Sequence, residues 1–520
     1  MRKFLILSLL GLSTLFLSAQ ETPRWGKWSR FGDNGDGTYS NPVLPMDFSD
    51  IDCIRVGDDY YAIASTFQFS PGVTLLHSRD LVNWEYCCNI VQDITSISPG
   101  MGYGRMDHYG RGIWAGSLRY HDGMFHLFFG TPDEGYFCTS SPAPEGPWEP
   151  LTCLMAGPGW DDCSAIWDEY GKAYFVGTCF SEGYKTYIFD MSPDGKSIDR
   201  SSARLINSDM GREANKLIRH GRWYYLVYSE YDGTARYVMA RRARKVEGPY
   251  SEPKRLSLHN RAEREPNQGG IIQGKNGRWY FLTHHGSLDW SGRLVSLLPV
   301  RWKHGWPIIG DKGRMVWDGA MPGKEENLRL AADEGFESIG PQWQWNCQPR
   351  EDMYSLVERP GWLRLKAFVP LKPVMEGAGN TLVQRIRRVP ESVVTLKMDT
   401  GGMAIGQKAG LCHLSAKSSV IEAAVTDEGM RIQVENADSV VCSAPLASGE
   451  LWLRSEWDSD GNNRFFYSTD GISYEAFGPA HRLSAGHYTG DRIGVFCYNT
   501  VREEGYADFD FISYSTSPNP

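Results

Sequence analysis

A short pattern recurs five times in the first 285 residues of the chain: a polar turn that contains glycine, then an aromatic, strand-forming run. In such a hairpin, glycine supplies the positive φ of the turn, and the run that follows favours a β-strand. Helical periodicity over a dozen residues is almost absent between the copies. The copies read VGDDYYAIAST, HDGMFHLFFGT, EYGKAYFVGT, HGRWYYLVYS and NGRWYFLTHH, with their turn glycines at Gly57, Gly123, Gly171, Gly221 and Gly277.

Five such units, about 50 to 65 residues apart, predict a five-bladed β-propeller with one four-stranded sheet per blade. A pair of plain β-sandwiches is the alternative architecture. After a charged stretch at 322–335, alternating strands such as WLRLKAF and RFFYSTD predict a β-sandwich. We therefore expect an all-β protein with a signal peptide at 1–20, a propeller catalytic domain at 21–325 and a β-sandwich accessory domain at 326–520.

The N-terminus predicts export. It has a basic start, an apolar stretch from Phe4 to Phe16, and small residues at Ser18 and Ala19. This is the pattern of a secretory signal peptide, and it is too short and too poorly flanked for a membrane-spanning helix. No later segment of the sequence is long and apolar enough to span a bilayer. We expect a mature protein in the periplasm or outside the cell.

Composition narrows the classes of partner. The formal net charge is −9 and we find no basic run, which argues against nucleic acid and anionic membrane surfaces. Aromatic residues make up 13% of the chain, including 18 Trp, and flat sugar rings stack well on Trp and Tyr, although aromatic residues also pack β-structure. The eleven Cys lack metal-binding spacing, so buried thiols are favoured over a disulfide framework.

Carboxylates fall at equivalent places on the repeat. Because a propeller converges its inner strands on a central channel, polar residues that enter those strands can meet there. A polar side chain in that position costs several kcal/mol unless it is paired or used, so three carboxylates indicate a shared site. The residues about seven to nine positions before the turn glycines are Asp50, Trp114, Asp162, Glu213 and Gln268.

Converging carboxylates without His/Cys spacing suit glycoside hydrolysis. That reaction needs one general acid and a second carboxylate that activates water or attacks carbon. A third carboxylate can raise the pKa of the acid by like-charge repulsion. A calcium site is the alternative for clustered acids, although the oxygen-rich loop spacing it needs is not evident here.

At these residues the sequence resembles glycoside hydrolase family 43, the β-xylosidases and α-L-arabinofuranosidases. The resemblance extends from NPVLPMDFSDIDCIRVGDDYYAIAST through GWDDCSAIWDEYGKAYFVGT and GREANKLIRHGRWYYL to SGRLVSLLPVRWKHGWPIIG. It implies that Asp50 is the general base, that Glu213 is the general acid, and that Asp162 tunes and positions the acid. It also implies inversion, with the two reacting carboxyl groups about 6.5–9.5 Å apart.

The resemblance assigns further residues to the substrate pocket. Trp114 and Gln268 look like channel-lining residues, and Arg293 looks like the substrate-contacting arginine of the family. Phe67 belongs to an aromatic cluster that either forms a sugar platform or packs a blade. We expect no required cofactor. Some family members place a histidine near a central metal ion, so His284 is the candidate ligand if a structural ion such as calcium binds.

The second half also has a known likeness. FESIGPQWQWNCQPREDMYSLVERPGWLRLKAF and GYADFDFISY resemble the concanavalin A-like C-terminal domain of family 43 β-xylosidases. The sequence departs from the family pattern at three places in the site. The proline that the family has after each of the two aspartates is replaced by Ile51 and by Cys163, and the family's Glu-Gly-Pro is replaced by Glu213, Ala214 and Asn215. Proline stiffens the backbone, so its loss could loosen the neighbouring carboxylate.

Together these features predict an exo-acting, inverting glycoside hydrolase that releases terminal or side-chain pentoses from plant cell-wall polysaccharide or its oligosaccharides. The sugar is β-D-xylose or α-L-arabinofuranose, and the EANKL motif favours the second slightly. A carbohydrate-binding propeller that has lost catalysis is the alternative class. The sequence does not indicate an oligomeric state.

Overall fold

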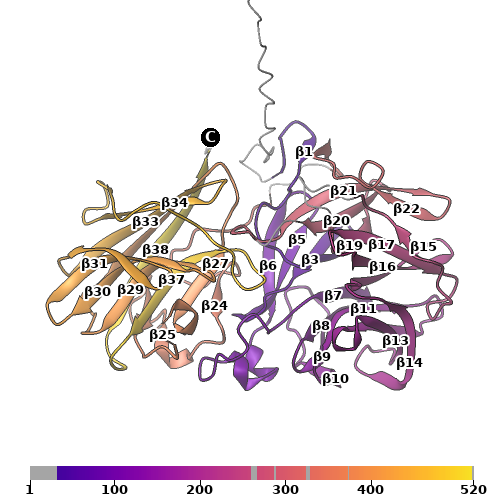
Figure 1. Ribbon diagram of the computed structural model, residues 1–520, viewed down its shortest axis with the longest axis horizontal. Helices are drawn as coiled ribbons and strands as arrows, with labels where there is room; N and C mark the ends of the chain where they lie inside the picture. Colours follow the sequence, from indigo (N-terminus) through magenta and orange to yellow (C-terminus); the bar gives the residue numbers. More distant parts are fainter. Residues whose placement is uncertain (1–31, 259–265, 286–288, 324–327, 373, 518–520) are drawn as a thin grey trace, which may run out of the picture.

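The computed structural model describes residues 32–258, 266–285, 289–323, 328–372 and 374–517 (Figure 1). The predicted signal peptide at 1–20 lies outside the described residues, and so does the predicted domain boundary at 325. Both stay predictions. No helix within the described ranges is long and apolar enough to cross a membrane.

The first part of the chain is a five-bladed β-propeller, as the repeat predicts. Each blade is an antiparallel four-stranded sheet, and the chain visits the five sheets in order. Blade 1 contains β2 (Asp52–Val56), β3 (Asp59–Ala64), β5 (Gly72–Ser78) and β6 (Trp84–Val91); blade 2 contains β7 (Gly116–His121), β8 (Met124–Thr131), β9 (Gly135–Ser141) and β10 (Thr152–Ala156). Blade 3 contains β11 (Trp160–Trp167), β12 (Ala173–Cys179), β13 (Lys185–Met191) and β14 (Ile198–Ser208); blade 4 contains β15 (Glu213–His220), β16 (Trp223–Tyr231), β17 (Arg236–Ala243) and β18 (Lys254–Arg255). Blade 5 contains β19 (Gly269–Gln273), β20 (Trp279–His285), β21 (Leu294–Lys303) and β22 (Trp306–Ile309).

The five predicted turn glycines connect the first and second strands of the five blades, and all have positive φ, between 58° and 81°. Apolar clusters fill the space between neighbouring blades. The ends of the propeller meet where Leu44 bridges Val295 of β21 and where β1 (Thr38–Ser40) pairs with β23 (Asp318–Ala320). In every blade the first strand runs toward its turn glycine, so the first strands of all blades start at the same end of the propeller.

The second part of the chain is a β-sandwich, as predicted. One sheet has the strand order β32 (Ser439–Pro445), β31 (Gly429–Asn436), β30 (Ser419–Thr426), β29 (Gln407–Leu414), β37 (Arg492–Asn499), β27 (Thr381–Arg385), β24 (Gln344–Asn346) and β4 (Phe69–Ser70). The other has the order β25 (Tyr354–Ser355), β26 (Leu363–Lys366), β38 (Tyr506–Ser517), β28 (Glu391–Asp399), β33 (Glu450–Asp458), β34 (Asn462–Ser468) and β35 (Glu475–Ala476), with β36 (His481–Arg482) paired to β34. A large apolar core lies between the two sheets. Short 3₁₀ helices are η1 (Ile94–Ser96), η2 (Pro99–Met101), η3 (Phe180–Glu182), η4 (Glu351–Met353) and η5 (Met375–Gly377).

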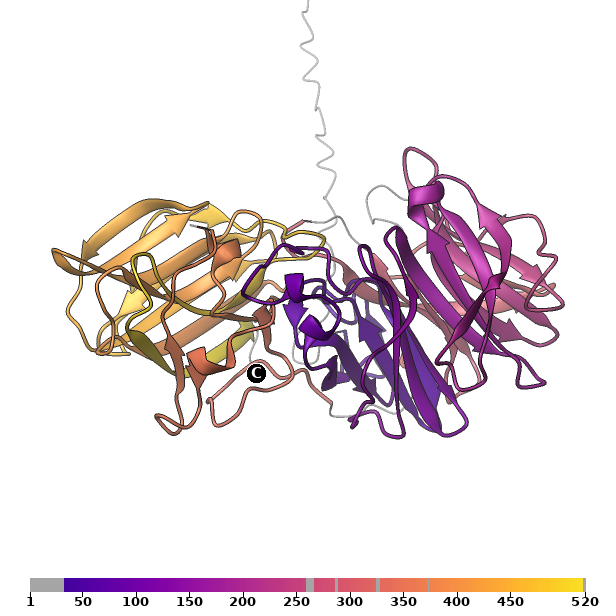
Figure 2. The same ribbon diagram turned by 90° about the horizontal axis from the view of Figure 1, so that it is seen from below.

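The two domains share a sheet. Strand β4 belongs to the propeller segment of the chain, yet it pairs with β24 at the edge of the first sandwich sheet. Phe69 of β4 is buried in an apolar cluster with Val383 and Phe496 of the sandwich. In Figure 2 the indigo segments of the propeller lie between the sandwich and the later blades. The sandwich therefore packs against the part of the propeller that carries Asp50.

All eleven cysteines lie within the described residues and carry free thiols. Seven of them are buried, including Cys53 and Cys163 in the blades and Cys412 and Cys497 in the sandwich. This agrees with cysteine as a small buried apolar residue rather than as part of a disulfide framework.

Candidate active site

A cavity of about 530 Å³ opens at the end of the propeller where the first strands begin. This volume lies in the range typical of small-ligand sites. All eight residues that the sequence singles out lie on its wall. The lining residues are Asp50, Phe67, Arg111, Trp114, Ala115, Asp161, Asp162, Thr178, Phe180, Tyr184, Glu213, Arg236, Asn267, Gln268, His284, Arg293 and Tyr488.

Unusual backbone geometry directs the carboxylates into this cavity. Asp50, Asp162 and Ala214 have φ of 59°, 49° and 65°, in the left-handed region that residues other than glycine rarely adopt. The pairing register also shifts within β11 after Asp161 and within β15 after Glu213, as in a β-bulge. Bulges re-aim side chains next to active sites, and this kind of strain is concentrated at functional positions.

Asp50 is held on three sides. Its Oδ1 accepts a 2.8 Å hydrogen bond from Arg293, its Oδ2 accepts a 2.7 Å bond from Ser65, and its backbone N–H donates to Nδ1 of His284 over 2.8 Å. Ile51, which stands where the family has proline, is fully buried in the core between blades 1 and 5. These contacts fix the carboxylate without proline. Each oxygen keeps a lone pair for a water molecule.

Two adjacent aspartates form one wall of the cavity. Burial raises the pKa of Asp162. The hydrogen bond from the backbone N–H of Ala214 lowers this pKa, and the negative charge of Asp50 raises it. Gln268 donates to Asp162 Oδ1 over 3.3 Å. Burial, followed by the charge of Asp162, also raises the pKa of Asp161 well above its usual range. Oδ1 of Asp161 is buried and has no hydrogen-bond partner within the described part of the chain. A protonated Asp161 would present an acidic hydrogen to a ligand.

Glu213 has the pKa of a general acid. Its pKa is raised to about 7: burial raises it most, the neighbouring Arg236 guanidinium lowers it, and the Asp162 carboxylate raises it. Arg236, at the start of β17, forms an ion pair with Oε1 of Glu213. A carboxyl group with this pKa still holds its proton in a large fraction of molecules near neutral pH, so it can donate a proton there.

Aromatic side chains from both domains form another wall. The Tyr488 ring, from the sandwich, stacks on Phe67 with centroids 6.0 Å apart and planes 17° apart. It meets Trp114 edge-on at 5.5 Å, and Phe180 lies 6.2 Å from Trp114 on another side. Rings arranged in this way offer apolar faces to a sugar.

Asp47 links the Arg293 backbone to the loop that carries Tyr488. Its Oδ1 accepts a hydrogen bond from the backbone N–H of Arg293 at 3.0 Å, and its Oδ2 accepts one from Gly490 at 3.2 Å. The backbone oxygen of Asp47 accepts a 2.6 Å bond from Arg385 of the sandwich. One buried residue thus positions groups from both domains around the cavity.

His284 does not fit the role of a metal ligand. Its Nδ1 accepts the Asp50 N–H, so in the neutral ring the proton resides on Nε2, and burial lowers the pKa of His284 well below its usual value. A ring nitrogen that carries a proton cannot coordinate a metal ion. Nε2 of His284 is buried and has no partner among the described residues, so this N–H points to a ligand or a water molecule. Within the described ranges, no group of three His, Cys, Asp or Glu is arranged to hold a metal ion.

A buried lysine lies among the first strands of the blades and carries a positive charge there. Lys216 of β15 is only 2% exposed; its Nζ donates to the Gly116 carbonyl over 2.5 Å and lies 4.0 Å from Oδ2 of Asp52. The same Asp52 oxygen accepts a 2.9 Å bond from Arg119 of β7. Asp52 is therefore a structural carboxylate that joins three blades, and its charge is balanced by protein groups.

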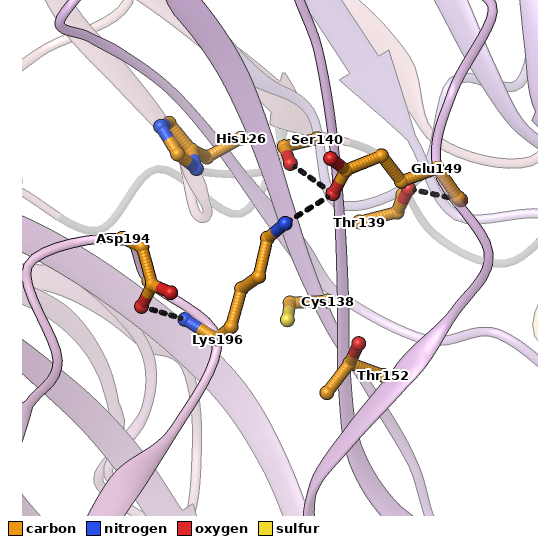
Figure 3. Close-up of a pocket in the computed structure, with 9 residues that line it drawn as sticks. His126, Cys138, Thr139, Ser140, Glu149, Thr152, Asp194 and Lys196 are labelled. Carbon is orange, nitrogen blue, oxygen red and sulfur yellow. Dashed lines mark hydrogen bonds and ion pairs between the residues drawn. The ribbon is translucent and has the colours of Figure 1, made fainter.

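A second pocket lies in blades 2 and 3, where β9 meets the turn between β13 and β14 (Figure 3). Lys196 Nζ lies 2.6 Å from Glu149, which also accepts a 2.8 Å bond from Ser140, and the backbone N–H of Lys196 donates to Asp194. The volume is about 10 Å³, enough for about one water molecule. Its charged groups pair with one another, so it is a structural contact between blades.

Several cavity residues are not anticipated from the sequence. Asp161 is visible as the first half of the doublet in GWDDC, but the resemblance points to its neighbour. Arg236, Tyr184 and Tyr488 carry no pattern, because they come from loops or strand starts that only the folded chain brings to the cavity.

The chain is similar to known proteins along nearly its whole length. Residues 39–307 match the model for glycosyl hydrolases family 43, and residues 334–515 match that for the β-xylosidase C-terminal concanavalin A-like domain. A β-xylosidase of Formosa agariphila is 30% identical over 98% of this chain and 96% of its own length. A non-reducing end α-L-arabinofuranosidase of Bacteroides ovatus is 28% identical over 66% of this chain and 67% of its own.

Solved structures agree with the fold. A family 43 protein of Bacillus licheniformis, at 25% identity, aligns with a TM-score of 0.82 over 92% of this chain and 99% of its own. A bifunctional protein of Bacteroides eggerthii aligns with a TM-score of 0.83 at 29% identity, and the present chain spans 63% of its length.

Proposed function

The chain belongs to family 43 of the glycosyl hydrolases and is a glycosidase, and we propose that it removes single pentose units from plant cell-wall polysaccharide or its oligosaccharides. The observation that carries this proposal is the convergence of Asp50, Asp162 and Glu213 on one cavity walled by aromatic rings. The sandwich contributes Tyr488 to that wall, which supports an exo-acting site that takes a chain end or a side group.

The proposed reaction is a single displacement with inversion. Asp50 removes a proton from a water molecule as its oxygen attacks the anomeric carbon, and Glu213 gives its proton to the departing glycosidic oxygen. Burial and, to a smaller extent, the nearby carboxylate of Asp162 keep the pKa of Glu213 high. Arg293 orients Asp50, and the unpartnered groups on Asp161 and His284 are available to sugar hydroxyls.

Two pentoses are candidates, each supported by an observation. The β-xylosidase of Formosa agariphila aligns with almost the whole chain, which supports β-D-xylose. The EANKL motif and the Bacteroides ovatus relative support α-L-arabinofuranose. The family match favours an active enzyme over a carbohydrate-binding propeller, and a propeller that only binds sugar has no need of a half-buried acid whose pKa is raised to about 7.

The experiment is hydrolysis of aryl β-D-xyloside and aryl α-L-arabinofuranoside, side by side, by the wild-type chain and Glu213→Gln. We expect wild-type turnover of at least one substrate. Glu213→Gln should lose about 10²- to 10⁴-fold in kcat on xylo-oligosaccharides, whose leaving groups need a proton, and much less on dinitrophenyl glycosides. Unchanged rates on oligosaccharides with a folded variant would refute the assignment of Glu213.

We also propose that the enzyme needs no metal and is exported. The protonated Nε2 of His284 and the buried Lys216 support the first point. Activity should survive dialysis against EDTA and should not rise when Ca²⁺ is added. Loss of activity that Ca²⁺ restores would contradict the metal-free proposal.

The basic and apolar N-terminal segment supports export, and N-terminal sequencing of the mature protein should find cleavage near Ala19 or Gln20.

A further inference from the structure

A surface rich in arginine and tryptophan lies at the end of the propeller opposite the cavity. Strand β15 begins at Glu213 in the cavity and ends at His220, and seven steps of about 3.3 Å place the next turn about 23 Å away. The turn between β21 and β22 lies at the same end, because Arg242 of β17 donates hydrogen bonds to the carbonyls of His304 and Gly305. Figure 1 shows β15, β17 and β22 on the side of the propeller away from the sandwich. We call Arg222, Trp223, Arg242, Arg244, Lys254 and Trp306 the basic–aromatic face.

Cations cover the indole rings of this face. The guanidiniums of Arg244 and Arg242 lie 4.1 and 4.4 Å from the Trp223 ring centroid, and Arg222 lies 5.7 Å away. Arg242 also lies 4.3 Å from the Trp306 ring, with Lys254 at 4.9 Å. Such contacts hold the cations in place. Because their faces are occupied, these rings offer little stacking surface to a neutral sugar.

Among the residues that the structure describes, few carboxylates accompany the cations of this face. The segments 220–223, 241–255 and 301–306 hold nine Lys or Arg and two Glu, in a chain with a net charge of −9. The interpretation that the sequence holds no basic run is therefore wrong here: RRARK at 241–245 carries four cations, and the fold places cations from two further segments beside it. Within the described residues, none of the following six cations forms an ion pair with a carboxylate: Arg222, Arg244, Lys245, Lys254, Arg301 and Lys303.

We propose that the basic–aromatic face binds the uronate groups of an acidic plant polysaccharide, such as glucuronic acid-substituted xylan. The class of polymer rests on the proposed function. Guanidinium groups pair with carboxylates through two parallel hydrogen bonds, and arginines already fixed against tryptophan lose little freedom on binding. A second attachment point outside the cavity keeps a chain end near the active site between turnovers.

The test is binding of the full chain to glucuronoxylan and to the same polymer after its carboxyl groups are reduced to alcohols. The test variant is Arg244→Glu/Lys254→Glu. The matched control is Arg200→Glu/Lys417→Glu, which changes the net charge equally at exposed positions elsewhere. We expect the test variant to lose about tenfold in affinity for the acidic polymer and the control to lose less than twofold. Turnover of aryl pentosides should stay unchanged in both variants.

Three results would overturn the proposal: equal binding of the carboxyl-reduced polymer, equal loss in the control variant, or duplex DNA binding as tightly as glucuronoxylan with the same loss in the test variant. The milder pair Arg244→Gln/Lys254→Gln replaces the test variant if the charge reversal impairs folding. Turnover of aryl pentosides by the wild-type chain is a separate readout. Its absence would contradict the proposed function, whereas uronate binding is judged by the polymers alone.

Discussion

At Glu213, burial acts on a single proton together with two cations, Arg236 and Arg293, and two carboxylates, Asp162 and Asp50. Burial raises its pKa, Arg236 opposes that effect through a direct ion pair, and Asp162 supports it. Because Glu213 must be protonated to act, these neighbours determine the upper pH limit of the reaction. The balance can be changed from either side without touching the carboxyl group itself.

Replacing Arg236 or Asp162 should move the basic limb of the pH profile in opposite directions. Arg236→Gln removes the charge that favours ionised Glu213, so its pKa should rise from about 7 by about one unit. Asp162→Asn removes a like charge, so the pKa should fall. The measurement is kcat/KM against pH with an aryl pentoside that is well below saturation.

The control for these profiles is Arg111→Gln, which changes a cation that lines the same cavity but is paired with Asp133 at 2.5 Å. Its basic limb should coincide with that of the wild type. Shifts of Arg236→Gln and Asp162→Asn in the same direction would contradict the electrostatic account of Glu213.

At the scale of elements, bulged strands and one sandwich loop build the cavity. Strands β11 and β15 change register just where Asp161 and Glu213 leave the ladder. The segment between β36 and β37 carries Tyr488, whose φ of 64° turns its ring toward Phe67. Asp47 holds this loop through Gly490. The ring is therefore positioned by the backbone and not only by packing.

Tyr488→Ala should lower kcat/KM about 3- to 10-fold, because it removes one aromatic face from the wall while the carboxylates stay in place. Tyr488→Phe keeps the ring and should remain close to the wild type. The pH profile of Tyr488→Ala should match the wild type. A loss of activity as large as that of Glu213→Gln would show instead that the loop acts on the reacting groups.

For the whole molecule, the repeated turn-and-strand pattern of the blades explains why the fold and the three carboxylates could be predicted from the sequence. A turn glycine in each blade marks the register, so the amino-acid sequence is enough to place Asp50, Asp162 and Glu213 at one end of the propeller. Tyr488 could not be predicted, because it reaches the cavity through contacts between domains. The RRARK segment does not predict the basic–aromatic face, because its charge becomes a surface only when β17 lies beside the turn between β21 and β22.

The interface explains why the sandwich belongs to the site. It takes β4 from the propeller into its own sheet, and Arg385 binds the backbone of Asp47, three residues before Asp50. The general base, the substrate arginine and the aromatic wall therefore depend on one continuous structure. The role of the two reacting carboxylates within it is the central claim, and stereochemistry reports on that role directly.

Proton NMR of the sugar first released from an aryl pentoside tests this claim. A base and an acid on opposite faces of the sugar give inversion, so β-D-xyloside should release α-D-xylose, and α-L-arabinofuranoside should release the β-anomer, before mutarotation. Spectra recorded within minutes of adding enzyme separate the anomers. Release of the sugar with its configuration retained would mean that a carboxylate attacks carbon, and would contradict Asp50 as a general base.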